Sequence, residues 1–182
     1  MNDLIVRVYP LQKNKSKGRL FWQGVEYACA LGKGGILSQV NKAEGDGATP
    51  FGLFPLRDFY YRNDKLRTLK TAFSKNIIKV NDAWCDDPKD KNYNQHITLP
   101  SSTSYEKLFR NDGQYNVVIP LGYNDGPIIP HKGSAIFFHI AREGLTPTKG
   151  CIAISQESML AVLKTLGPNC LMRVYPSPCI EI

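Results

Sequence analysis

The feature that most constrains the fold is a series of short segments in which apolar and polar residues alternate. Alternation with a period of two places side chains on opposite faces of a β-strand, and turn-forming residues separate most of these segments. The segments are residues 4–9, 20–31, 51–62, 115–123, 134–141 and 170–175. We predict a mostly β fold in which the first two segments form a hairpin around a loop at 13–18.

Helical spacing is clear in one place, directly after Cys151. Ser155 is suited to cap the N-terminus of this helix, and Gly167 followed by Pro168 is suited to end it. Between these ends, apolar residues recur at helical spacing, at Met159, Leu160, Leu163 and Leu166. We also expect one or two helical turns at 105–110 and irregular, polar structure at 84–94.

The length of the chain and its apolar content indicate how it is organised. With 182 residues, 42% of them hydrophobic, the chain is long enough for one domain and short for two, so we expect a single domain over residues 1–182 and a monomer. No apolar run approaches the roughly 20 residues that span a bilayer. Residues 1–10 alternate as a strand does and lack the regions of a signal peptide. We therefore expect either a cytoplasmic protein or one exported by a signal outside this chain.

The formal net charge of +7 favours acidic partners. The basic residues are scattered, and their densest cluster is in the polar stretch of the first hairpin, at Lys13, Lys15, Lys17 and Arg19. A solvated loop explains this cluster, and no glycine-rich phosphate loop follows a strand. We expect no nucleic-acid partner, whereas a substrate rich in carboxylates fits the basic excess.

The cysteine and histidine positions do not have the spacing of a metal site. None of the five cysteines forms a Cys-x-x-Cys pair, and the three histidines are scattered, so we expect no metal and no cofactor. Cys170 and Cys179 flank the last predicted strand, and we interpret both as buried thiols.

One histidine and one cysteine can form a reactive pair. Alternation in the segment 134–141 places His139 on the same face as Phe137 and Ala141. A loop that contains Gly144 and Pro147 can return the chain, so that Cys151 meets this histidine.

Cysteine attacks as a thiolate, which a neighbouring imidazole or aligned backbone amides promote. His139 can supply the imidazole. Gly150 lets the backbone amides before Cys151 converge on one point, as an oxyanion requires. Residue types alone leave a second interpretation open, in which Cys151 is a small buried hydrophobe and His139 a hydrogen-bonded core residue.

Two motifs resemble those of a known family. The sequence Thr148-Lys149-Gly150-Cys151-Ile152, preceded by the strand histidine, resembles the signature of the YkuD-type L,D-transpeptidase catalytic domain. The upstream sequence Thr49-Pro50-Phe51-Gly52-Leu53-Phe54 is similar to the Thr-Pro-x-Gly-x-Phe segment of the same family. The order of the two motifs and their separation also match. The segments 84–94 and 122–125 resemble a smaller proteobacterial branch.

The resemblance implies a mostly β, sandwich-like fold with one helix after the cysteine, one or two further short helices, and a cleft at the catalytic pair. It also implies that Cys151 is the nucleophile and His139 the general base. The amides of Gly150 and Cys151 are then oxyanion donors, and Thr148 occupies the hydroxyl position of the motif. In the family, the cysteine takes an acyl group from a peptidoglycan stem tetrapeptide and passes it to an acceptor amine. Such a substrate implies the periplasm or cell envelope.

The sequence departs from the family pattern at two positions. Ala153 stands where many members have arginine, and Ile140 stands where many have glycine. We hypothesise that Arg142 replaces the missing arginine and binds a substrate carboxylate. A solvated surface charge is the alternative for Arg142.

Polar loops beside a rigid sheet often border binding sites. On this basis Asp86, Tyr93 and Asn124 are candidates for substrate binding. Turns held by Asp and Asn side chains are the alternative explanation for these residues.

Two other functions stay open. A hydrolase with the same thioester chemistry, either an L,D-carboxypeptidase or a cross-link amidase, would let water replace the acceptor amine. A catalytically inert wall-binding module would need neither Cys151 nor His139.

Overall fold

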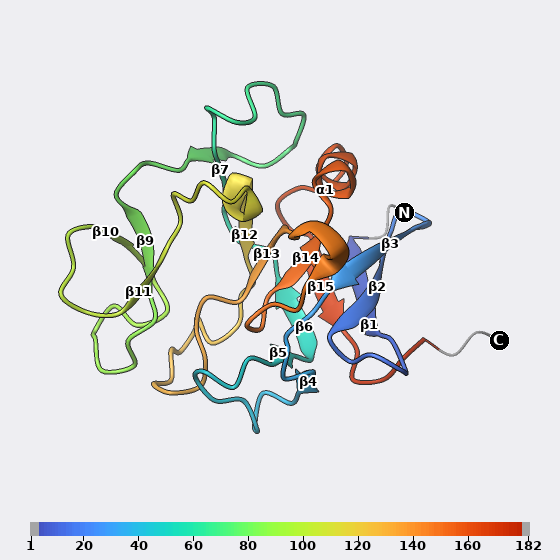
Figure 1. The fold of residues 1–182 in the computed structure, drawn as a ribbon, viewed down its shortest axis with the longest axis horizontal. Coiled ribbons are helices and arrows are strands. Elements are labelled where there is room, and N and C mark those ends of the chain that lie inside the picture. Colours follow the sequence, from blue (N-terminus) through green and yellow to red (C-terminus); the bar gives the residue numbers. More distant parts are fainter. Residues whose placement is uncertain (1–3, 180–182) are drawn as a thin grey trace.

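The computed structural model describes residues 4–179. As predicted, the fold is mostly β, with a single α-helix in the described part and a large curled sheet (Figure 1). The strands form one ten-stranded sheet, one three-stranded sheet and one two-stranded sheet. This arrangement matches the expected L,D-transpeptidase-like β-sandwich.

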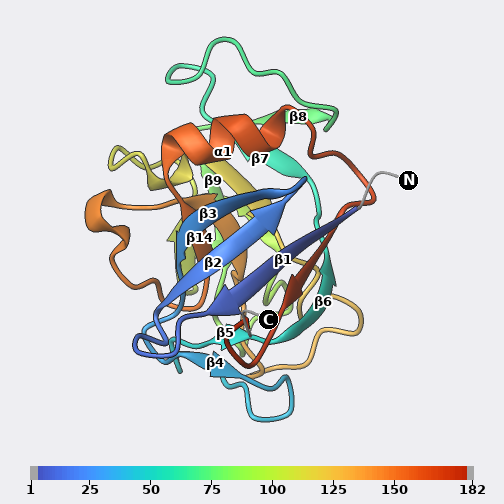
Figure 2. The ribbon, with the colours of Figure 1, turned by 90° about the vertical axis from the view of Figure 1, so that its right-hand side faces the viewer.

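The first half of the large sheet is built around the N-terminal hairpin. Its strands, in spatial order, are β6 (Gly52–Pro55), β15 (Leu171–Val174), β1 (Ile5–Pro10), β2 (Lys17–Trp22) and β3 (Val25–Ala30). The predicted single strand at 20–31 is wrong, because the chain turns between β2 and β3. Gln23 and Gly24 both have positive φ, 50° and 77°, which is the backbone of a two-residue hairpin turn. In Figure 2 no helix covers the face of β1 and β2 that is turned to the viewer.

The second half of the sheet carries the cysteine and the histidine. It continues from β3 through β14 (Ile152–Ile154), β13 (Phe137–Ile140), β12 (Val117–Pro120), β7 (Phe59–Tyr61) and β8 (Lys75–Ile77). Strands β12 and β13 are shorter than the predicted segments 115–123 and 134–141, and β7 covers only the end of the predicted segment 51–62. A short 3₁₀ helix, η1 (Gln114–Asn116), precedes β12.

The predicted strand at 51–62 is wrong, because it is divided into β6 and β7. Leu56 bridges to Leu121, and the Arg57 amide donates to the carbonyl of Pro120 at 2.9 Å. The chain thus passes from β6, which pairs with β15, to β7, which pairs with β12. This crossing brings the two halves of the curled sheet together.

A small sheet stands beside the large one. It consists of β10 (His96–Thr98), β9 (Asp82–Cys85) and β11 (Tyr105–Lys107). The helical turn predicted at 105–110 is wrong, because residues 105–107 pair antiparallel with residues 83–85. The same pairing makes Trp84 and Cys85 part of a strand, so the irregular segment is shorter than expected. The remaining two strands, β4 (Ile36–Leu37) and β5 (Thr49–Pro50), pair in parallel.

The predicted helix after Cys151 is confirmed as α1 (Gln156–Leu163). The Ser155 hydroxyl accepts a hydrogen bond from the Ser158 amide at 3.1 Å, which is the expected cap. Met159, Leu163 and Leu166 are fully buried in the main core. A further short 3₁₀ helix, η2 (Glu143–Leu145), lies in the loop before Cys151.

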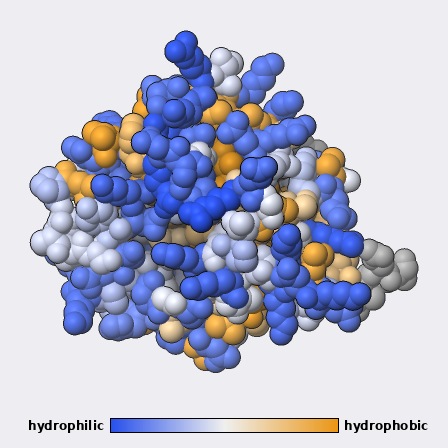
Figure 3. Space-filling view, viewed as in Figure 1, coloured by the Kyte–Doolittle hydropathy of each residue, from blue (hydrophilic) through white to orange (hydrophobic). Residues whose placement is uncertain are grey.

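The core has two parts. The larger packs α1 against the inner face of the curled sheet, and the smaller consists of Ile78, Leu108, Tyr115, Val118, Phe137 and Cys151. Hydrophilic residues dominate the surface seen in Figure 3. Among residues 4–179, no helix has the length and apolar character needed to cross a membrane.

Candidate active site

Cys151 opens into a cleft of about 680 Å³. The small sheet, the loop at 41–48 and the loop after β13 surround this cleft. Its lining residues are Lys33, Glu44, Gly45, Gly47, Asp86, Glu106, Arg110, Gln114, Tyr115, Ser134, Ala135, His139, Arg142, Pro147, Thr148, Lys149 and Cys151. Five of the eight predicted site residues, Cys151, His139, Thr148, Arg142 and Asp86, therefore lie around one cavity.

Strand register places the thiol and the imidazole on the same face. In the parallel pair β13–β14, His139 is opposite Ala153. Cys151 is two residues before Ala153, so its side chain points to the same side as that of His139. The backbone of the segment leading into β13 holds the thiol: the Phe137 amide donates to Sγ at 3.4 Å, and Sγ donates to the Ala135 carbonyl at 3.3 Å.

The ring of His139 is held by the backbone. Its side chain is buried, and Nδ1 lies 2.8 Å from the carbonyl oxygen of Ile140. A carbonyl only accepts hydrogen bonds, so Nδ1 carries the proton in this contact. The ring of Tyr115 packs edge-on at 5.2 Å and fixes the imidazole further. With Nδ1 protonated, Nε2 is the ring nitrogen that can take a proton.

Both partners are uncharged in the resting site. Burial lowers the pKa of His139 to about 4, which the Ile140 carbonyl opposes in part. Burial also raises the pKa of Cys151 to about 12, and the hydrogen bond from the Phe137 amide acts in the opposite direction. At neutral pH the site therefore holds a thiol and a neutral imidazole, so proton transfer has to accompany nucleophilic attack.

The turn before Cys151 requires glycine. Gly150 has φ of 135°, and a Cβ at this position would lie 3.0 Å from the carbonyl oxygen of Ala48 and 3.1 Å from Cδ1 of Ile136. The Thr148 hydroxyl donates to the Cys151 carbonyl at 2.7 Å and accepts from the Gly150 amide at 3.2 Å. Thr148 thus fixes both ends of the turn, and the Gly150 amide has to leave this long bond before it can bind an oxyanion.

The upstream Thr-Pro motif supports the same turn. The Thr49 hydroxyl accepts from the Gly32 amide at 2.9 Å, and Gly32 bridges to Thr148. The adjacent carbonyl of Ala48 packs against Gly150 and accepts from Lys42 Nζ at 2.8 Å. Two motifs that are far apart in the sequence therefore meet at the turn before Cys151.

Sequence reasoning missed several charged residues in the cleft. Glu106 and Arg110 pair at 2.5 Å, and the Arg110 guanidinium also lies 4.8 Å from the centre of the Tyr115 ring. Both residues lie in the segment 105–110, which was predicted to be helical. Residues 105–107 instead pair with β9 beside the cleft. Lys33 and Glu44 stand in loops whose polar residues gave no sign of the site.

Tyr93 and Asn124 do not line the cleft. The Tyr93 hydroxyl is buried, donates to Glu44 Oε2 at 2.5 Å and accepts from the Gly133 amide at 3.0 Å. The Asn124 side chain donates to the carbonyls of Ile129 and Gly133 and accepts from the Ile129 amide. Asn124 therefore holds a turn, whereas Tyr93 orients a carboxylate that does face the cleft.

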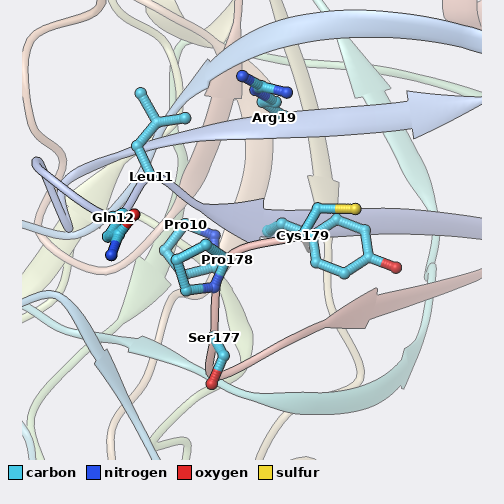
Figure 4. Close-up of a pocket in the computed structure, with 8 residues that line it drawn as sticks. Pro10, Leu11, Gln12, Arg19, Ser177, Pro178 and Cys179 are labelled. Atoms are coloured by element: carbon cyan, nitrogen blue, oxygen red, sulfur yellow. The ribbon is translucent and has the colours of Figure 1, made fainter. Parts of the chain in front are cut away.

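A second cavity lies where β1 ends, close to the end of the described chain (Figure 4). Its lining residues are Tyr9, Pro10, Leu11, Gln12, Arg19, Ser177, Pro178 and Cys179. Cys179 is exposed, unlike Cys170, so its predicted burial is wrong. These lining residues include no histidine or carboxylate that could act with the Cys179 thiol.

One of three comparisons with known proteins gives a match. The sequence model of the YkuD family, described as the L,D-transpeptidase catalytic domain, matches residues 11–174. No curated protein gives a significant match, and neither does any solved structure. Within residues 4–179, no group of three or more His, Cys, Asp or Glu side chains is placed to hold a metal ion.

Proposed function

Because the chain belongs to the YkuD family of L,D-transpeptidase catalytic domains, we propose that it transfers acyl groups between peptidoglycan stem peptides through a thioester on Cys151. One observation carries this proposal: the Cys151 thiol shares a strand face and a cleft with the imidazole of His139. The family acts on the cell wall, so we propose the periplasm or cell envelope as the site of action.

In the first half-reaction, the Cys151 sulfur attacks the carbonyl carbon that joins the stem peptide to its terminal D-residue. The thiol proton passes to Nε2 of His139 as the carbon–sulfur bond forms. The tetrahedral intermediate collapses, the carbon–nitrogen bond breaks, and the leaving amine takes the proton from His139. The enzyme then carries a thioester, and the terminal D-residue is released.

In the second half-reaction, the amine of an acceptor stem attacks the thioester. His139 takes a proton from the attacking nitrogen and returns it to the departing sulfur. A new amide bond replaces the thioester, and the neutral thiol and imidazole are restored. Neither half-reaction requires a redox step.

Stabilisation of the oxyanion is essential here because the resting pair is neutral. With the pKa of His139 at about 4 and that of Cys151 at about 12, separating the charges without substrate is strongly unfavourable. Amide donors at the Gly150–Cys151 turn would stabilise the negative charge when it appears on the substrate. Attack and proton transfer are then favoured only when a carbonyl occupies the cleft.

Arg142 is exposed on the loop after β13 and lines the cleft. We propose that it binds a carboxylate of the stem peptide, in place of the arginine that the family often has at the position of Ala153. Ala153 itself is buried, with 1% of its surface exposed. A long cationic side chain at this position would have to leave the core to reach the substrate.

The reaction can be tested with a purified tetrapeptide muropeptide. We expect dimers and free terminal D-residue from the wild type, and no thioester adduct on Cys151→Ala by mass spectrometry. Cys179→Ala, which removes the exposed thiol of the second cavity, should keep wild-type activity. Shortened monomers without dimers would instead indicate a hydrolase, and unchanged biological activity of Cys151→Ala would indicate an inert wall-binding module.

A further inference from the structure

Asn94 is a buried side chain in the turn between β9 and β10, and it bonds to two other parts of the chain. Its Oδ1 accepts from the Trp84 indole and from the Ala135 amide, both at 3.0 Å. Its Nδ2 donates to the carbonyls of Tyr123 and Asn124 at 3.0 and 2.9 Å. The carboxamide therefore makes all four hydrogen bonds of which it is capable. Its orientation is fixed, because the indole and the backbone amide only donate and the carbonyls only accept.

Ala135 has a backbone conformation that depends on such support. Its φ is 52°, in the left-handed region that residues other than glycine seldom adopt unless their surroundings hold them there. Ala135 lies before β13 begins at Phe137, so its amide bonds to the Asn94 side chain and not to a sheet partner. Phe137 differs, since it is held by pairing with Pro120 of β12.

The thiol of Cys151 lies between these two neighbours. The Ala135 carbonyl accepts from Sγ at 3.3 Å, and the Phe137 amide donates to Sγ at 3.4 Å. The sheet fixes the second contact, whereas the first belongs to the residue that Asn94 holds. The position of the sulfur at rest therefore depends, through Ala135, on the side chain of Asn94.

Trp84 joins this arrangement to the small sheet. It belongs to β9, the central strand, which pairs with both β10 and β11. Besides donating to Asn94, its ring packs edge-on against Phe137 with the ring centres 5.3 Å apart. Both backbone groups that contact the sulfur thus belong to residues supported by Trp84, one through Asn94 and the other directly.

We infer, on the basis of the proposed function, that Asn94 is a positioning residue for acyl transfer, which places the Cys151 sulfur for attack by holding Ala135. Displacement of a reacting atom by about 1 Å costs on the order of a hundredfold in rate. Asn94 is not among the residues that line the cleft, so its loss should slow thioester formation without weakening the binding of the stem peptide.

Asn94→Gly is the main variant. Asn94 has a φ of 56°, which glycine adopts without strain, so the substitution removes the side chain and spares the backbone. Acylation of Cys151 by a tetrapeptide is followed by mass spectrometry in single turnovers. We expect the maximal rate to fall by about tenfold to a hundredfold, with the peptide concentration for the half-maximal rate within about twofold of the wild type.

Alkylation of Cys151 by iodoacetamide at about pH 8 is a second readout, and it needs no peptide. It is measured in a Cys179→Ala background, which removes the exposed thiol. A carbonyl that accepts from a thiol favours the protonated form. Release of the Ala135 carbonyl should therefore speed alkylation, by up to about tenfold, while acylation slows. Cys29, buried in the main core, is the internal control, because its alkylation would report unfolding.

The two tryptophans provide a matched pair of milder variants. Trp84→Phe keeps an aromatic ring and removes the indole donor to Asn94, so we expect acylation to slow by about twofold to tenfold. Trp22→Phe is the control, because its indole donates to Thr165 at 2.8 Å and its ring lies in the main core. Its acylation rate should equal that of the wild type.

The outcomes separate the inference from the proposed function. The inference is overturned if Asn94→Gly, with Cys29 unreactive, acylates at the wild-type rate or shows unchanged alkylation of Cys151. If Asn94→Gly does not fold, equal acylation rates for Trp84→Phe and Trp22→Phe overturn it. The proposed function fails if no stem peptide acylates Cys151 in the wild-type protein, and alkylation then decides whether Asn94 holds the thiol.

Discussion

Nδ1 of His139 donates its hydrogen bond to the carbonyl oxygen of Ile140, the next residue in β13, at 2.8 Å. The contact uses the backbone of residue 140 and not its side chain. The replacement of glycine by isoleucine at this position therefore leaves the orientation of the imidazole intact. It also means that no carboxylate is needed to select the tautomer that presents Nε2.

We predict that His139→Gln lowers kcat by about a hundredfold to ten-thousandfold, the range for loss of a general base. The glutamine side chain can still bond to a carbonyl but cannot take a proton. The rate of thioester formation on Cys151, followed by mass spectrometry, checks this. If the variant acylates as fast as the wild type, another group accepts the thiol proton.

The position of His139 and Cys151 in one cleft and the helix could be predicted because their signals are local. Alternation fixed the face of His139, and the serine cap with apolar spacing fixed α1. The turn at Gln23–Gly24 was missed because the residues around it also alternate, and alternation alone does not show where a strand reverses. Strand β11 was missed for another reason, since only pairing with a distant strand makes residues 105–107 extended.

Of the charged residues in the cleft, Asp86 and Arg142 were predicted, whereas Glu44 and Lys33 were not. Glu44 and Lys33 lie on separate loops, which the fold brings around one cleft with Cys151. Their polarity fitted solvent-exposed turns equally well. Long-range contacts of this kind leave no periodic signal in the sequence.

A second prediction concerns stability below neutral pH. The unfolded imidazole titrates near 6.5, whereas burial holds the pKa of the folded His139 at about 4. As pH falls through this window, the unfolded chain binds a proton that the folded protein does not, so the free energy of unfolding decreases. The loss is on the order of 3 kcal/mol by pH 4. Urea unfolding at several pH values should show this slope in the wild type and a smaller one in His139→Gln.

A third prediction concerns Thr148, whose hydroxyl bonds to both ends of the Gly150 turn. Thr148→Val keeps the shape and removes both bonds, so we expect a decrease in kcat with a modest loss of stability, about 1 kcal/mol for each bond. Thr148→Ser retains the hydroxyl and should recover most of the activity. Equal rates for the valine and serine variants would contradict a role for the hydroxyl.

The last prediction separates backbone strain from close contact at Gly150. Gly150→Ala places a methyl group against the Ala48 carbonyl in a backbone conformation with φ of 135°, so we expect a loss of stability of about 1–3 kcal/mol and a large loss of activity. Gly24→Ala is the matched control, because Gly24 also has positive φ, 77°, and a Cβ there would meet nothing within 4 Å. Its stability should decrease by only about 1 kcal/mol, with activity unchanged. If Gly150→Ala still forms the thioester at the wild-type rate, the turn before Cys151 does not position the nucleophile. If the two variants lose equal stability, the contact with the Ala48 carbonyl adds nothing to the free-energy cost of placing alanine at a positive φ.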